Sequence, residues 1–175
     1  MNRRRWLGSA LGLLAVAPCS LAHTPYRQWQ VYRQKHLLIG CHRQDPAGYA
    51  LAKRVVAVLE QQLPNARARV ARGPTAGRLA SLLGTEQMEV VLLDSEEVAA
   101  MSAGHGAFAP YGDIPLRALA RLDDHWLVAH ADFPERHARL VTQALRSERS
   151  FADTGGQPPP VAWHPGSLDS HEHRR

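Results

Sequence analysis

Two patterns of hydrophobic residues alternate along residues 36–147 and predict strands and helices in turn. Short apolar runs are typical of buried strands, whereas apolar residues repeated every three or four positions indicate helices with one buried face. The runs predict strands over residues 36–41, 66–71, 88–93, 116–122 and 125–130. The helical spacing predicts helices over residues 46–63, 75–84, 96–102 and 133–147. This part of the chain therefore has the pattern of an α/β protein.

Each of the first three predicted strands is followed by a helix, and this order predicts how the strands pair. A return to a parallel strand requires a crossover of that length. We therefore expect one α/β domain over residues 36–149, with three layers and a mostly parallel sheet. Ligands of such sheets bind beyond the carboxyl ends of the strands, where helix N-termini expose free N–H groups. The candidate binding loops are residues 40–48, 73–77 and 94–97.

The N-terminus has the three parts of a secretory signal peptide. Three arginines at positions 3–5 are followed by an apolar stretch over residues 6–18 and by small residues that place a cleavage site near Ala22. The apolar stretch is too short for a comfortable membrane span. We expect residues 1–22 to be removed during export, leaving a periplasmic protein with no membrane anchor after cleavage.

Two details of this segment bear on the export route. Residues 3–7, with the sequence RRRWL, resemble the twin-arginine signal of a bacterial exporter that carries folded cargo. Trp6 stands where that signal usually has phenylalanine, so the general secretory route stays open as an alternative. A lipid anchor on Cys19 is disfavoured, because Pro18 occupies the position where a small residue is expected before a lipid-modified cysteine.

Removal of the signal peptide changes the charge and the cysteine content of the protein. It removes three of the 21 Lys and Arg residues and none of the 16 Asp and Glu residues, which leaves 18 against 16, or formally +2. This small excess gives no support to a nucleic-acid partner. Cys19 is also removed, so Cys41 cannot form an internal disulfide. A buried thiol is expected, with an intermolecular bridge or a metal ligand as alternatives.

The two ends of the mature chain differ in composition from the central domain. Residues 23–35 are polar and aromatic, with Tyr26, Trp29 and Tyr32 at three-residue spacing. We expect an N-terminal arm that packs on the surface of the domain. Residues 150–175 are rich in Pro, Gly and His, a composition that buries little surface, and we expect a flexible tail.

Several segments resemble the TAXI-type solute receptors, which are the periplasmic binding proteins associated with TRAP transporters. They include PTAGRL at 74–79, MEVVLLDS at 88–95 and HPGS at 164–167, with looser likeness over residues 37–63, 82–83 and 115–134. In that family the early elements form the first lobe of a two-lobed receptor, and its Thr/Gly/Ser-rich turn contacts the ligand. The resemblance implies the fold of one lobe of a type II periplasmic binding protein.

The chain is too short for the second lobe that closes on the ligand in full receptors of this kind. The resemblance therefore implies a reduced relative that acts as an exported, non-enzymatic ligand-binding or accessory module without a cofactor. It implies a small carboxylate-type solute as ligand, and a membrane transporter or a periplasmic enzyme as partner. The positions that it assigns to ligand contact are Tyr49, Thr75, Arg78 and Ser95, although Ala76 and Arg78 depart from the small or hydroxyl residues of the family's turn.

The same positions have a plainer interpretation. Thr75 and Ser95 precede predicted helices, where a hydroxyl side chain ordinarily caps the helix. Arg78 would then be a solvated surface residue. Capping is the default role of such residues, and it is the interpretation that we favour.

Two further groups of residues have the chemistry of a site. His164, His171 and His173 could bind copper, zinc or nickel through imidazole, but a flexible tail imposes no closed geometry, so only weak metal binding is expected. Cys41 beside His42 could form the thiolate pair of a small enzyme. Neighbours on a strand point to opposite faces, however, which disfavours that pair.

One rival function remains open from the sequence. The twin-arginine-like signal and the histidine-rich tail would suit an accessory or maturation factor for an exported redox or metal enzyme. Paired catalytic carboxylates, a Ser/His/acid arrangement and a phosphate-binding loop are not evident, so we expect a protein that is not itself an enzyme.

Overall fold

The computed structural model describes residues 36–148, 151 and 158–172. The predicted signal peptide over residues 1–22 and the predicted arm over residues 23–35 lie outside these residues. The strands are β1 (Leu38–His42), β2 (Arg69–Gly73), β3 (Val90–Asp94), β4 (Leu116–Leu122) and β5 (His125–His130). The α-helices are α2 (Pro46–Gln62), α3 (Ala76–Gly84), α4 (Ser95–Ser102), α5 (Glu135–Ser147) and α6 (Pro165–Glu172), with short 3₁₀ turns η1 (Pro64–Ala66) and η2 (Gly106–Tyr111).

The five strands form one mixed sheet in the order β2-β1-β3-β5-β4. β1 pairs in parallel with β2 and β3, as their intervening helices predict. β5 pairs antiparallel with both β3 and β4. The expectation of a mostly parallel sheet is therefore wrong, since two of the four pairings are antiparallel. β4 and β5 are joined only by Asp123 and Asp124, and so short a turn can return the chain only antiparallel.

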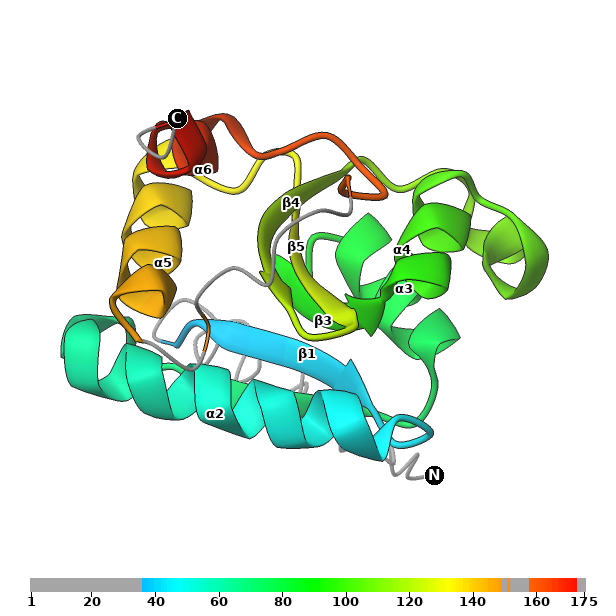
Figure 1. The fold of residues 1–175 in the computed structure, drawn as a ribbon. Coiled ribbons are helices and arrows are strands. Elements are labelled where there is room, and N and C mark those ends of the chain that lie inside the picture. The colour runs from blue at the N-terminus through cyan, green and yellow to red at the C-terminus, as the bar shows by residue number, and fades with distance from the viewer. Residues whose placement is uncertain (1–35, 149–150, 152–157, 173–175) are drawn as a thin grey trace, which may run out of the picture.

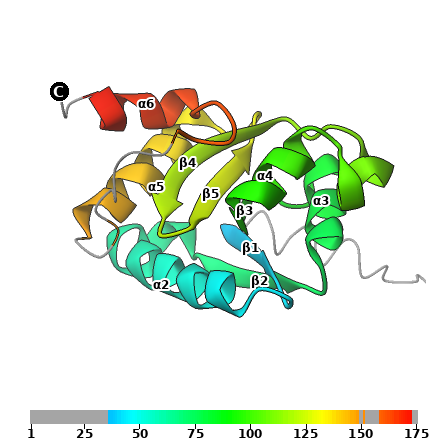
Figure 2. The same cartoon turned by 45° about the vertical axis from the view of Figure 1, so that its right-hand side comes forward.

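Helices cover both faces of the sheet (Figures 1 and 2). Val90 and Leu92 of β3 point to the face covered by α2 and α5, whereas Val91 and Leu93 point to the face covered by α3 and α4. Successive strand residues thus feed two separate hydrophobic clusters, as the period-two geometry of a strand requires. The prediction of a single α/β domain with a sheet between helices is confirmed.

Strand β4 bends to contribute to both clusters. Its register shifts between Ala118 and Ala120, so that Leu116 faces the α3/α4 cluster and Leu122 faces the α2/α5 cluster. Such a bulge inserts one extra residue and reverses the facing of the side chains after it. The bounds predicted from the sequence for β4 and β5 match the structure.

Part of the C-terminal segment covers the outer edge of β4, which corrects the prediction of a flexible tail for residues 158–172. The amide of Ala118 donates to the carbonyl of Ala162 at 2.9 Å, and the amide of His164 donates back to the carbonyl of Ala118 at 2.9 Å. Helix α6 then packs on α5. These bonds protect an otherwise open sheet edge, a role that composition alone did not indicate.

Strand β2 begins later than the sequence predicted. Residues 64–66 form the turn η1, and Arg67 then adopts a left-handed backbone with φ of 46°. Pro64 starts this turn, because its fixed φ suits a tight turn and it has no amide hydrogen to donate to a ladder. The strand accordingly starts at Arg69 instead of residue 66.

Among the described residues, no helix combines the length and the hydropathy that crossing a membrane requires.

Candidate functional site

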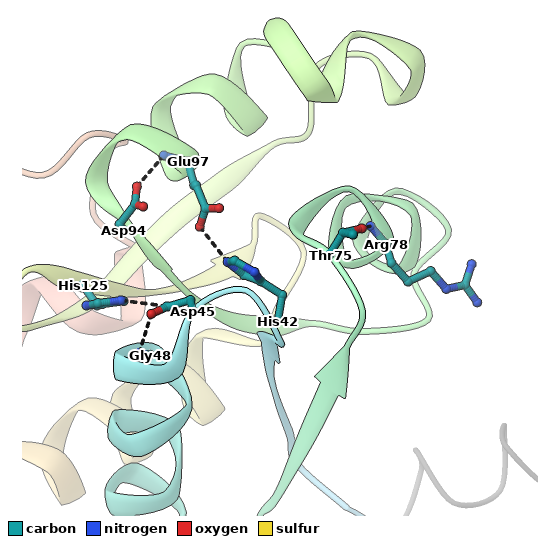
Figure 3. Close-up of polar contacts among 8 residues, drawn as sticks. All are labelled: His42, Asp45, Gly48, Thr75, Arg78, Asp94, Glu97 and His125. Atoms are coloured by element: carbon teal, nitrogen blue, oxygen red, sulfur yellow. Dashed lines mark hydrogen bonds and ion pairs between the residues drawn. The ribbon is translucent and has the colours of Figure 1, made fainter.

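The carboxyl ends of β1, β2 and β3 meet at one edge of the sheet, and three helices begin there (Figure 3). The Asp45 carboxylate accepts from the amide of Gly48 at 2.8 Å and caps α2. The Asp94 carboxylate accepts from the amide of Glu97 at 2.7 Å and caps α4. The Thr75 hydroxyl caps α3. The candidate binding loops chosen from the sequence therefore do share one edge, as parallel pairing requires.

Two histidine–carboxylate pairs link the loops of this edge. Nε2 of His42, at the end of β1, lies 3.1 Å from a carboxylate oxygen of Glu97 on α4. Nε2 of His125, at the start of β5, lies 2.8 Å from a carboxylate oxygen of Asp45. The imidazole side chains are only 5% and 10% exposed, so these pairs are shielded from solvent screening. Each pair fixes a helix start to a neighbouring strand.

The carboxyl group of Glu97 is the electrostatically perturbed member of the cluster. Burial raises its pKa above the ordinary value, and the nearby carboxylates of Asp94 and Asp45 add to the rise. The imidazole of His42 opposes this rise by charge and by hydrogen bonding. Nδ1 of His42 is buried and has no hydrogen-bond partner among the described residues. The buried side of the edge thus holds acidic groups that already have internal partners.

Basic side chains lie on both faces of the sheet near this edge, with Arg78 on α3 and Arg72 on the face that α2 covers. Arg72 and Arg78 are exposed. Arg78 points away from the histidine–carboxylate pairs (Figure 3), and its Nη1 lies 3.4 Å from the hydroxyl of Ser81. The guanidinium of Arg72 stacks 4.4 Å from the ring centre of Tyr49. The edge therefore has an acidic half at the starts of α2 and α4, whereas Arg78 brings a basic side chain to the start of α3.

The structure separates the four residues that the resemblance assigned to a ligand. The Thr75 hydroxyl accepts from the amide of Arg78 at 3.2 Å, which confirms the capping interpretation for Thr75. The capping interpretation is wrong for Ser95, because Asp94 caps α4 and the Ser95 hydroxyl accepts from the Trp126 indole N–H at 3.0 Å. Tyr49 lies between the cations of Arg72 and Lys53. Thr75, Arg78 and Tyr49 stay at the exposed edge, whereas Ser95 belongs to the packing around Trp126.

Cys41 lacks the environment of a nucleophilic cysteine. Its side chain is fully buried in the α2/α5 cluster. Burial raises the pKa of the thiol to about 11, although the nearby Arg72 cation partly opposes that rise. Because the thiolate is the reactive form, these two facts argue against the Cys41–His42 pair. His42 instead uses Nε2 to bind Glu97.

Of the histidines proposed for weak metal binding, the structure describes the side chain of His164. His164 is buried, and its Nε2 donates to the carbonyl of Phe133 at 2.8 Å while its Nδ1 accepts from the amide of Gly166 at 3.2 Å. Both ring nitrogens are thus used within the protein. His171 lies in helix α6, and His173 lies outside the described residues. Nowhere in residues 36–148 or 158–172 do three His, Cys, Asp or Glu side chains form a group that could hold a metal ion.

Sequence reasoning did not find the two histidine–carboxylate pairs. His42 and Glu97 are 55 positions apart, and Asp45 and His125 are 80 positions apart. The sequence did carry one signal for the carboxylate members of these pairs, which is an acidic residue before or within the first turn of a helix that follows a strand. The His42–Glu97 pair depends on β1 lying beside β3, and the His125–Asp45 pair depends on β5 lying beside β3.

Comparison with known proteins gives no relative, since no protein-family model and no curated protein matches the chain significantly.

Proposed function

We propose that this protein is an exported, non-enzymatic binding module that holds a small carboxylate at the α3 side of the sheet edge. Three helix starts meet there, and a helix start favours a negative charge. The carboxylates of Asp45 and Asp94 already occupy the starts of α2 and α4. The α3 start is capped by the neutral Thr75 hydroxyl. This difference among the three caps is the observation that carries the proposal.

The surrounding charges support the same side of the edge. The exposed side chain of Arg78 lies in the first turn of α3. Arginine binds carboxylates through two parallel hydrogen bonds, so this side chain suits such a solute. The carboxylates of Asp45, Asp94 and Glu97 would repel the solute from the other half.

The proposal relates this domain to one lobe of a type II periplasmic binding protein of the TAXI kind. The parallel β2-β1-β3 arrangement with helices on both faces is compatible with that relation. A lone lobe binds a solute on an open surface, because the burial that gives small-molecule sites their affinity comes from enclosure. We therefore infer weak solute binding that a membrane transporter or a periplasmic enzyme strengthens by covering the edge.

Thermal unfolding of the exported protein with a panel of small mono- and dicarboxylates tests this function. We expect at least one carboxylate to raise the melting temperature, since a ligand that binds only the folded state stabilises it. Arg78→Gln should reduce this rise, whereas Arg117→Gln, an exposed arginine on β4, should not. The proposal fails if no carboxylate moves the melting temperature, or if both substitutions reduce the rise equally.

A further inference from the structure

A hollow lies at the opposite, amino edge of the parallel strands. It has a volume of about 620 Å³ and lies between the end of α2, the residues before β1 and β3, and the first half of α5. Small-molecule sites typically have volumes of about 300–1,000 Å³. We call this hollow the α2/α5 groove, and its lining includes Leu63, Glu89, Phe133, Arg136 and Leu140.

The α2/α5 groove has an apolar floor and an apolar wall. Phe133 is only 3% exposed and forms part of the core, whereas Leu63 is partly buried. Leu140 is 38% exposed, one of three large apolar side chains exposed in the described residues. An apolar group placed in the groove would remove Leu140 from water, which is favourable in proportion to the area buried.

Opposite charges stand at the groove on different elements. Glu89 precedes β3, and Arg136 lies in the first turn of α5. Backbone hydrogen bonds connect Glu89 to the turn that precedes α5, because the amide of His130 donates to the Glu89 carbonyl at 2.8 Å and the amide of Phe133 donates to the His130 carbonyl at 3.0 Å. Both charged side chains are exposed, and neither makes an ion pair with another described residue.

We propose that the α2/α5 groove binds a short apolar peptide with free ends, such as a dipeptide. Its terminal carboxylate would pair with Arg136 and its ammonium group with Glu89. Its apolar side chains would cover Leu63, Phe133 and Leu140. The groove, with a volume of about 620 Å³, is larger than a single amino acid fills, which favours a dipeptide. This site is separate from the carboxylate site at the α3 edge.

Calorimetric titration of the full exported protein with L-leucyl-L-phenylalanine tests the site. We expect binding at millimolar peptide, and binding weaker by more than about tenfold for glycylglycine, which lacks apolar side chains. Acetylation of the N-terminus or amidation of the C-terminus should each weaken binding roughly two- to fivefold, as expected for exposed ion pairs. No measurable binding of the free dipeptide, or equal binding of the free and blocked peptides, would overturn the proposal.

Substitutions assign each peptide end to its partner. Arg136→Gln should weaken binding of the free dipeptide roughly two- to fivefold but leave binding of the amidated peptide unchanged. Glu89→Gln should likewise weaken binding of the free dipeptide but leave binding of the acetylated peptide unchanged. Leu140→Ala should weaken all of the peptides, whereas Leu168→Ala, a leucine of matched 39% exposure on α6, should weaken none. Arg78→Gln should leave dipeptide binding intact. Dipeptide binding that depends on Arg78 instead of Arg136 would contradict the proposal that the dipeptide binds in the α2/α5 groove.

Discussion

The side chain of Glu97 has one stabilising and one destabilising effect on the folded protein. Its carboxylate accepts a hydrogen bond from buried His42, and without that bond His42 would have no partner for either ring nitrogen among the described residues. Its negative charge, however, is disfavoured by burial and by two neighbouring carboxylates. A neutral acceptor of the same shape keeps the hydrogen bond to His42 and removes the cost of the buried negative charge.

Glu97→Gln is therefore expected to be at least as stable as the native protein at pH 7. Because the pKa of Glu97 is raised in the folded protein, protonation of this group stabilises the fold. That stabilisation is complete below the unfolded pKa of 4.5 and is lost as the pH rises through the folded pKa. The advantage of the glutamine should thus grow from pH 4 to pH 7. Urea unfolding at several pH values measures it.

Two further variants make this measurement specific. Glu97→Ala should lower the free energy of unfolding by about 1–3 kcal/mol at pH 7, because it leaves the His42 ring unsatisfied. Glu96→Gln alters an exposed carboxylate in the same turn and should have little effect. A Glu97→Gln protein as unstable as Glu97→Ala would show that His42 needs the charge and not only the acceptor.

At the scale of elements, α6 is held to the domain through His164. The buried imidazole stays neutral, since Nε2 donates to the Phe133 carbonyl and Nδ1 accepts from the Gly166 amide. The Ser167 hydroxyl adds a bond to the Ala118 carbonyl at 3.2 Å. A Cβ at Gly166 would overlap the backbone of Glu135, so the segment lies directly on the start of α5. The imidazole therefore ties the start of α6 to the turn before α5, and Ser167 ties it to β4.

The stability of the protein should decrease in mild acid because of His164. Burial lowers the pKa of this imidazole, although its bond to the Phe133 carbonyl partly opposes the shift. A lowered folded pKa contributes stability that is complete above the unfolded value of 6.5 and is lost as pH falls toward the folded pKa. Protonation would also place a hydrogen on Nδ1, where the Gly166 amide needs an acceptor.

His164→Gln can still donate to the Phe133 carbonyl but does not titrate. Its unfolding free energy should be lower than that of the native protein at pH 7.5 and should change less between pH 7.5 and pH 5.5. His105→Gln, which replaces an exposed histidine, should keep the native pH dependence. Equal pH dependence in the His164→Gln and native proteins would refute the role of His164.

The sequence predicted the elements better than their contacts. Local patterns were sufficient for α2, whose start at Asp45-Pro46 carries both a cap and an N-terminal proline, and for the bounds of β4 and β5. The packed C-terminal segment was missed because its bonds run to Ala118, in a strand distant in sequence. Composition indicated mobility there, but long-range hydrogen bonds determined the outcome.

The whole molecule combines parallel and antiparallel pairing, and this combination creates the candidate site. Parallel pairing of β1 with β2 and β3 gathers three helix starts, a feature that the strand and helix order predicted. Antiparallel pairing of β3 with β5 brings His125 to Asp45. The His125–Asp45 pair could not be predicted, since the sequence did not fix the position of β5 in the sheet.

The central claim is that a small carboxylate binds at the α3 side of this edge. The most direct test follows backbone amide resonances of the exported protein during titration with succinate. We predict shifts in residues 73–78, with smaller shifts in residues 43–49 and none in the α2/α5 groove. An absence of shifts at saturating succinate, or shifts confined to residues outside the edge, would contradict the claim.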